Sequence, residues 1–143
     1  MSKKNQYKEK FIEALKQENL KFTNQRFAIF EDVLYGKKHR ECEEILQSLS
    51  KKDINVSRAT VYRTLDILVK YELIRKMDIG DGRIRYEGKI DDPHHDHMIC
   101  VETGKIIEFV SDEIEMIQDK IAEEHGYKII KHIHQLFVKP IKK

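Results

Sequence analysis

The densest group of metal-binding side chains in this chain is the run His94-His95-Asp96-His97. Successive side chains of a β-strand point to opposite faces, so a strand here would place His95 and His97 on one face. His94 and Asp96 would share the other face. One run can therefore supply ligands to two separate metal sites. Imidazole suits zinc, iron, nickel and copper, and the carboxylate extends the choice toward manganese and iron(II).

The net charge of the 143-residue chain is only +2, but the charges are unevenly distributed. Residues 1–88 carry 19 Lys and Arg against 14 Asp and Glu, whereas residues 89–143 carry 8 against 11. A basic amino half followed by an acidic, histidine-rich carboxyl half indicates a polyanion-binding module joined to a cation-binding one.

The sequence also argues against several classes of protein. The two cysteines, Cys42 and Cys100, form no CxxC pair, which disfavours a disulfide framework and a thiolate zinc site. No apolar run approaches about 18 residues and the polar start resembles no signal peptide, so we expect a cytoplasmic protein without membrane contact. Because no Gly-rich phosphate loop, GxSxG or HExxH motif occurs, we do not expect an enzyme.

The amino half predicts helices followed by a β-hairpin. Thr23 and Ser57 are suitable helix caps, each standing directly before a segment of helical periodicity. Two strand-like segments, Leu73–Asp78 and Arg83–Glu87, flank the turn Gly80-Asp81-Gly82, which is a strong hairpin signal. Helices followed by a hairpin are the order of a winged helix-turn-helix. The helices are expected over residues 6–18, 24–35, 41–50 and 57–69.

The carboxyl half predicts a smaller unit that follows a linker. Its expected elements are strands over His97–Val101 and Lys105–Val110, a helix from Ser111 or Asp112 to about residue 124 with Ile114, Ile117 and Ile121 inward, and a last strand over Tyr127–Val138. So small a unit rarely holds itself together alone, so metal binding or dimerisation should stabilise it. We therefore predict an α+β protein with a winged-helix DNA-binding domain (1–88), a hinge (89–93) and a small α/β dimerisation and metal-binding domain (94–143).

The helix over residues 57–69 has the composition of a DNA-reading helix. Its spacing turns Val61, Leu65 and Leu68 toward the core and leaves Tyr62 and Arg63 toward solvent or a partner. Arg can pair bidentately with guanine, and a Tyr ring can pack against a thymine methyl or bind a phosphate. Exposed Tyr and Arg are usually only solvated surface, but the order of the elements and the basic charge favour DNA. Candidates for phosphate or minor-groove contact are Lys21, Arg26, Lys51, Lys52 and Arg58.

Four segments resemble the ferric uptake regulator (Fur) family. Residues 57–65 resemble its recognition-helix signature and residues 21–26 its amino-terminal entry motif, while residues 94–100 and 104–109 resemble its metal-binding core. The likeness runs from about residue 8 to residue 138. It implies a homodimeric bacterial repressor that binds AT-rich palindromic double-stranded DNA when loaded with a divalent metal. The sequence leaves open whether two dimers pair as a tetramer. In the family, the residues matching Tyr62 and Arg63 meet bases and the lysine matching Lys21 enters the minor groove.

The same resemblance implies two metal sites. The regulatory site would take Fe2+, with Mn2+ or Zn2+ as substitutes, and the second site could take Zn2+. Taken singly, His39 and His132 would pass for ordinary histidines, and Glu115 for a carboxylate favoured by a helix N-terminus. His125 and His134 match no ligand position. The ligands implied for the regulatory site are His39, Glu87, His95, His97 and Glu108, and those implied for the second site are His94, Asp96, Glu115 and His132.

The chain departs from the family at its cysteines. Many members hold a structural zinc with two CxxC pairs, but residue 103 is Thr and the carboxyl end has no cysteine, so we expect no four-cysteine zinc. Cys42 and Cys100 should pack as small apolar residues. Peroxide sensors of the family tend to have aspartates where this chain has Glu87 and Glu108, which favours iron sensing. A peroxide sensor, a zinc or manganese sensor, a zinc hydrolase and a plain winged-helix adaptor remain as alternatives.

Overall fold

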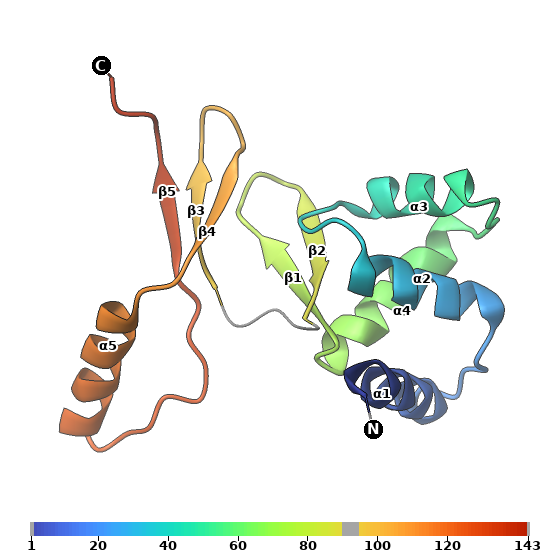
Figure 1. The fold of residues 1–143 in the computed structure, drawn as a ribbon, viewed down its shortest axis with the longest axis horizontal. Coiled ribbons are helices and arrows are strands. Elements are labelled where there is room, and N and C mark those ends of the chain that lie inside the picture. Colours follow the sequence, from blue (N-terminus) through green and yellow to red (C-terminus); the bar gives the residue numbers. More distant parts are fainter. Residues whose placement is uncertain (1, 90–94, 143) are drawn as a thin grey trace. The chain divides into compact units, whose positions relative to one another are not determined.

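The computed structural model describes residues 2–89 and 95–142, and the chain divides into two compact units on either side of the boundary between residues 92 and 93. In the described ranges the first unit has four helices and a two-stranded hairpin, and the second has a three-stranded sheet with one helix; Figure 1 labels these elements. The fold is therefore α+β, as predicted. Of the predicted hinge over residues 89–93, only residue 89 lies within the described part of the chain.

The helices of the first unit begin where the sequence provides caps. The Oγ1 atom of Thr23 accepts a hydrogen bond from the main-chain N–H of Arg26 at 3.1 Å, and the Oγ atom of Ser57 accepts one from that of Thr60 at 3.1 Å. Each cap satisfies a donor that would otherwise be left over at a helix start. The helices are α1 (Lys3–Gln17), α2 (Asn24–Tyr35), α3 (Cys42–Lys51) and α4 (Arg58–Lys70).

One apolar core holds the helices of the first unit together. Phe11 of α1 stacks on Phe30 of α2, with ring centroids 4.6 Å apart. Leu65 and Leu68 of α4 are fully buried in the same core, and Val61 joins them as predicted. The opposite face of α4 is exposed, so the expected division between inward and outward residues is confirmed.

The wing of the first unit is the antiparallel hairpin β1 (Ile74–Asp78) and β2 (Ile84–Gly88). Its turn contains Gly80 and Gly82 with φ of 83° and 80°, a conformation that glycine adopts without a steric penalty. The Gly-Asp-Gly hairpin signal is thus confirmed. At the other end of the hairpin, a Cβ atom on Gly88 would lie 2.6 Å from the main-chain oxygen of Leu34, so the wing packs closely against α2.

The second unit is a small sheet in the order β4-β3-β5. Its central strand β3 (Asp96–Cys100) pairs antiparallel with β4 (Ile106–Phe109) and parallel with β5 (Gln135–Val138). Between β4 and β5 lies α5 (Asp112–Glu124), capped by Ser111, whose Oγ accepts from the N–H of Ile114 at 3.3 Å.

Two expectations about the second unit are wrong. The last strand covers only residues 135–138 rather than 127–138, because its partner β3 has only five residues with which to form a ladder. The apolar face of α5 is also not inward in the single chain. Ile117 and Ile121 are 58% and 52% exposed, and only Ile114 is partly covered. No described element of its own unit covers the part of α5 that carries Ile117 and Ile121.

None of the helices in the described ranges combines the length and the apolar character that crossing a membrane would require.

Candidate metal centres and DNA-binding surface

The first unit contains one histidine–carboxylate pair. His39 lies between α2 and α3, and its Nε2 atom is 3.2 Å from Oε2 of Glu87 on β2. The other carboxylate oxygen of Glu87 is 3.7 Å from Nη1 of Arg75, the cross-strand neighbour on β1. His39 has φ of 61°, a left-handed backbone conformation that few residues other than glycine adopt. An imidazole nitrogen and a carboxylate oxygen at this spacing are suitable donors for a divalent first-row metal.

The second unit contains another such pair on one face of its sheet. His97 on β3 stands directly opposite Glu108 on β4, and Nδ1 of His95 is 3.4 Å from Oε2 of Glu108. The alternation of side chains along the strand therefore brings two imidazoles and one carboxylate together. Three of the five residues expected in the regulatory site gather here, and the other two are the pair His39 and Glu87 of the first unit.

The other face of β3 carries the second candidate site. The Nε2 atom of His132 is 2.9 Å from Oδ1 of Asp96 and 3.4 Å from Oε1 of Glu115. One ligand atom from each of these three residues lies within 4.8 Å of the others, so the set could hold a metal ion. His94, the fourth expected ligand, lies outside the described residues. His132 precedes β5 in an irregular segment, not on the strand as expected.

The two remaining histidines differ in their surroundings. The Nδ1 atom of His125 lies 2.9 Å from the main-chain oxygen of Ile121 at the end of α5. Nδ1 of His134 lies 3.8 Å from Oδ2 of Asp96, and its ring meets Phe109 edge to face with centroids 5.8 Å apart. His125 is thus exposed at the end of α5, whereas His134 is half-buried against Phe109 and Asp96.

Cys42 and Cys100 are both buried and neither forms a disulfide. Burial raises the pKa of the Cys42 thiol, which disfavours the thiolate needed for a metal bond. These positions match the expectation that the cysteines act as small apolar residues.

The expected DNA-reading residues lie on the exposed side of α4, at its first residue and in the segment before α2. Tyr62 is 44% exposed, and Arg63 next to it and Lys21 before α2 are exposed as well. Arg58, the first residue of α4, forms an ion pair with Glu43 of α3. Helix α4 therefore presents an aromatic and a cationic side chain together, with a second cation paired with a carboxylate at its amino end.

Two of the other basic candidates have partners within the fold. The Nζ atom of Lys52 lies 2.7 Å from Oδ1 of Asp32, and Nη1 of Arg26 donates to the main-chain oxygen of Lys21 at 2.6 Å. Lys52 is still 57% exposed at its side chain, so it can also face a polyanion. Arg26 stabilises the segment that carries Lys21.

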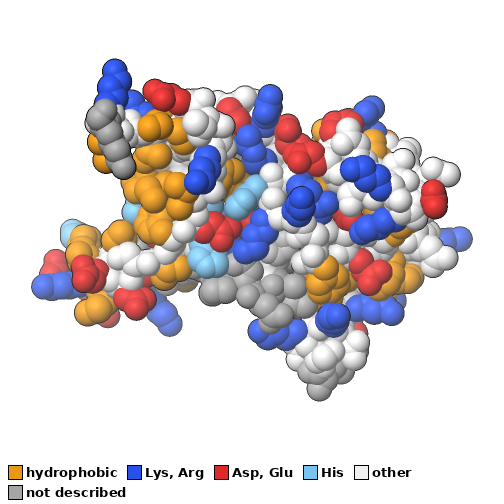
Figure 2. Space-filling view, turned by 45° about the horizontal axis from the view of Figure 1, so that its top comes forward, with side chains coloured by type: hydrophobic (Ala, Val, Ile, Leu, Met, Phe, Trp, Pro, Cys, Tyr) orange, Lys and Arg blue, Asp and Glu red, His pale blue; other side chains and the backbone are white. Residues whose placement is uncertain are grey.

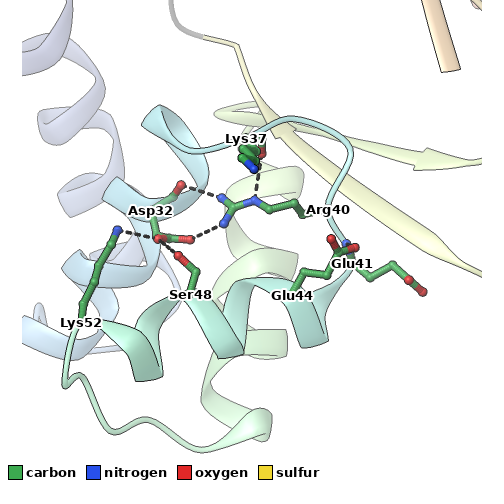
Figure 3. Close-up of polar contacts among 7 residues, drawn as sticks. All are labelled: Asp32, Lys37, Arg40, Glu41, Glu44, Ser48 and Lys52. Atoms are coloured by element: carbon green, nitrogen blue, oxygen red, sulfur yellow. Dashed lines mark hydrogen bonds and ion pairs between the residues drawn. The ribbon is translucent and has the colours of Figure 1, made fainter. Parts of the chain in front are cut away.

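A buried polar cluster in the first unit was not predicted. Figure 3 shows Asp32 of α2 surrounded by Arg40, Ser48 and Lys52, with Asp32 4% exposed and Arg40 8% exposed. The signal was present, because Asp32 lies three residues after Ile29 on the apolar stripe of α2, where a carboxylate needs a buried partner.

Apolar side chains gather on the surface of the second unit, as the orange area of Figure 2 shows. They come from α5, from the segment after it and from the sheet. Large exposed apolar areas are typical of interaction surfaces. The large apolar residues of the second unit that are more than half exposed are Val101, Val110, Met116, Ile117, Ile121, Tyr127, Ile130, Ile133, Phe137 and Ile141.

Sequence comparison with known proteins finds relatives that match nearly the whole chain. Residues 17–137 match the model of the Ferric uptake regulator family. The chain is 40% identical over 131 residues to the "Ferric uptake regulation protein" of Campylobacter jejuni, covering 90% of this chain and 83% of that protein.

Solved structures show the same likeness. The Helicobacter pylori ferric uptake regulator, described as having three functional metal-binding sites, superposes with a TM-score of 0.83 and 34% identity, over 95% of this chain and 90% of that one. The ferric uptake regulator from Pseudomonas aeruginosa with manganese superposes with a TM-score of 0.79 and 32% identity, over 90% of this chain and 96% of that one.

Proposed function

Because the chain belongs to the Ferric uptake regulator family, we propose that it is a metal-dependent transcriptional repressor that senses divalent iron and controls genes of iron homeostasis. The observation that carries this proposal is the pair of histidine–carboxylate groups, His39 with Glu87 in one unit and His95 and His97 with Glu108 in the other. The first group belongs to the unit that bears the winged helix.

We propose that these two groups ligate one divalent ion. Their imidazole and carboxylate donors suit iron(II), manganese and zinc, so the chemistry of the ligands fits a regulatory metal of this class. A bound divalent ion would be a single cationic centre that donors from both units can ligate. Ligation by His39 and Glu87 from one side and by His97 and Glu108 from the other would restrict the angle between the units.

That restriction is what would couple metal to DNA. A dimer reading a palindrome must hold its two recognition helices about one turn of DNA apart, roughly 34 Å. Metal ligation across the hinge would favour this spacing and so raise DNA affinity. The coupling is reciprocal, so operator DNA should tighten metal binding by the same factor.

On the DNA side, we assign base contacts to Tyr62 and Arg63, minor-groove contact to Lys21, and a phosphate contact to Arg58. The exposure of all four side chains supports this assignment. The target is AT-rich palindromic DNA, bound by a homodimer that uses one α4 from each protomer. The exposed apolar area of the second unit supports the homodimer, since a second copy would cover it, and two dimers could join as a tetramer.

The second set, Asp96, Glu115 and His132 with His94, would hold zinc and stiffen the dimerisation unit. All of these ligands come from the carboxyl half, so occupancy cannot act on the hinge directly. In a small unit without cysteine ligands, such a site supplies stability that its limited core does not.

Iron sensing is preferred to peroxide sensing because the regulatory set has glutamates at positions 87 and 108. Exposing the iron-loaded protein to hydrogen peroxide separates the two. In a peroxide sensor a ligand histidine would be oxidised, which mass spectrometry would detect as added oxygen. DNA binding would then be lost irreversibly. An iron sensor would recover DNA binding after fresh metal is added.

The proposal is tested by a gel shift of an AT-rich palindrome with Mn2+ or anaerobic Fe2+, followed by chelator. We expect a shift that needs the metal and disappears with chelator. A shift indifferent to chelator would instead indicate a winged-helix adaptor. A zinc hydrolase is disfavoured because it needs an open ligand position and a general base in a pocket. The hollow lined by Gln25, Ser57 and Thr60 contains no metal ligand.

A further inference from the structure

Arg40 follows His39 directly and is anchored at every nitrogen of its guanidinium. Nη1 donates to Oδ2 of Asp32 at 2.9 Å, Nη2 to the main-chain oxygen of Asp32 at 2.8 Å, and Nε to the main-chain oxygen of Lys37 at 2.8 Å (Figure 3). A planar guanidinium bound at three points has a fixed orientation, which a flexible ammonium group would not have.

Asp32 is itself held from a second helix. Its Oδ1 atom accepts hydrogen bonds from Oγ of Ser48 and Nζ of Lys52, each at 2.7 Å. Burial raises the pKa of the Asp32 carboxyl, but the hydrogen bonds from Lys52 and Ser48 and the charge of Arg40 hold that pKa below its ordinary value. The side chain of Arg40 therefore ties the segment after α2 to both α2 and α3.

The backbone of Arg40 is bound to the wing. Its N–H donates to the oxygen of Tyr86 at 3.3 Å, and the N–H of Tyr86 donates back at 2.8 Å, which forms an isolated antiparallel bridge. In antiparallel pairing the residue before Arg40 stands opposite the residue after Tyr86. This register sets His39 against Glu87, at the observed 3.2 Å between side chains.

Two further features show that the surrounding residues fix the backbone conformation of residues 36–41. His39 has a left-handed backbone with φ of 61°, and such a conformation persists only where the surroundings impose it. A Cβ atom on Gly36 would lie 2.3 Å from Nη2 of Arg40 and 2.3 Å from the main-chain oxygen of Asp32. The guanidinium thus reaches the end of α2 only because residue 36 has no side chain.

We propose that Asp32 and Arg40 are positioning residues for the metal response, which fix residues 36–41 so that His39 is presented to Glu87 before a metal ion binds. This inference rests on the proposed function, because it assigns a task to residues behind a proposed ligand. Neither residue would touch the ion. Without the anchor, His39 would leave its left-handed conformation, and metal binding would have to restore it.

The test uses full-length Arg40→Met, which keeps an unbranched apolar stem and loses all three hydrogen bonds. The readout is the Mn2+ concentration at half-maximal binding of a fluorescent AT-rich palindrome, measured with the unfolding temperature. Loss of a group that orients a ligand typically weakens metal binding by about 10- to 100-fold, so the Mn2+ midpoint should rise by at least about 10-fold.

The control is Arg85→Met in the same unit. Arg85 is also buried and also pairs with an aspartate, Asp81 at 3.0 Å, but within the described ranges no hydrogen bond or ion pair joins it to residues 36–41. Its Mn2+ midpoint should stay within about twofold of the wild-type value. Gly36→Ala, which would force a Cβ against the guanidinium, should shift the midpoint in the same direction as Arg40→Met.

A double variant, Asp32→Leu with Arg40→Met, separates positioning from stability, because an apolar pair can replace a buried ion pair without loss of stability. A double variant that unfolds at the wild-type temperature but has a raised Mn2+ midpoint would support the proposal. If the Mn2+ midpoint and the unfolding temperature of the double variant both return to the wild-type values, the proposal is overturned. An unshifted Mn2+ midpoint in the single variant Arg40→Met would overturn it as well. If DNA binding by both the wild-type protein and His39→Ala is independent of Mn2+, that result contradicts the proposed function rather than the positioning role.

Discussion

Replacing Arg63 by Ala should remove sequence-specific DNA binding while leaving the fold and metal uptake intact. Arg63 is exposed on α4, and the core residues of that helix face the other way, so the truncation should not disturb packing. An arginine that reads a base contributes about 1–3 kcal/mol. A palindrome is read by two copies of α4, so the loss for the dimer should be about 2–6 kcal/mol, or a decrease in affinity of at least about 30-fold.

The measurement is fluorescence anisotropy with a labelled palindrome and with random DNA of equal length, at fixed salt and saturating Mn2+. Because random DNA is bound mostly through phosphates, its affinity for the Arg63→Ala variant should change little. Lys70→Ala, at the far end of the same helix, is the matched control, since its ammonium is paired with Glu18. Equal operator affinity for wild type and Arg63→Ala, or an equal loss on both DNAs, would refute base reading by this residue.

Three further predictions follow from the site and its surroundings. His97→Ala should abolish Mn2+-activated DNA binding without dissociating the dimer, as gel shift and light scattering would measure; a variant that still responds at unchanged Mn2+ would show that its face of β3 is not the regulatory one. Glu43→Gln should raise affinity for any DNA and make binding more salt-dependent, because Arg58 would be released from its ion pair to meet a phosphate; unchanged salt dependence would contradict that role. The pKa of Asp32 is lowered in the folded state, the hydrogen bonds from Lys52 and Ser48 outweighing the opposing effect of burial, so its contribution to stability is complete above about pH 4 and is lost as pH falls through the lowered value; acid unfolding of Asp32→Asn should therefore depend less steeply on pH below about pH 4, and an identical slope would count against it.

Local signals predicted most of the secondary structure. Thr23, Ser57 and Ser111 cap the helices they were expected to cap, and the Gly80–Gly82 turn closes the wing. Such signals act over a few residues, so they can be recognised without knowledge of the fold. The last strand was overestimated because its length depends on β3, a partner far away in the sequence.

The candidate sites were predictable to a different degree. Alternation along β3 correctly placed His95 and His97 on one face and Asp96 on the other, where it meets His132. The cluster behind His39 was missed, because the sequence does not show that Arg40, in the segment after α2, comes within 2.9 Å of Asp32 when the unit is packed. A charged residue on an apolar stripe signals a buried partner but does not identify it.

The sequence by itself determined the types of donor, the face of the strand or helix on which each stands, and the exposed position of Tyr62 and Arg63 on α4. These properties depend on side-chain chemistry and on periods of 2 and 3.6 residues, which are local. Only the tertiary structure decided that Glu87 meets His39, that Arg40 anchors the segment between them, and that the apolar face of α5 is left exposed in a single chain. Those outcomes depend on packing between segments far apart in sequence, where shape, burial and hydrogen-bond satisfaction of the whole unit select one arrangement.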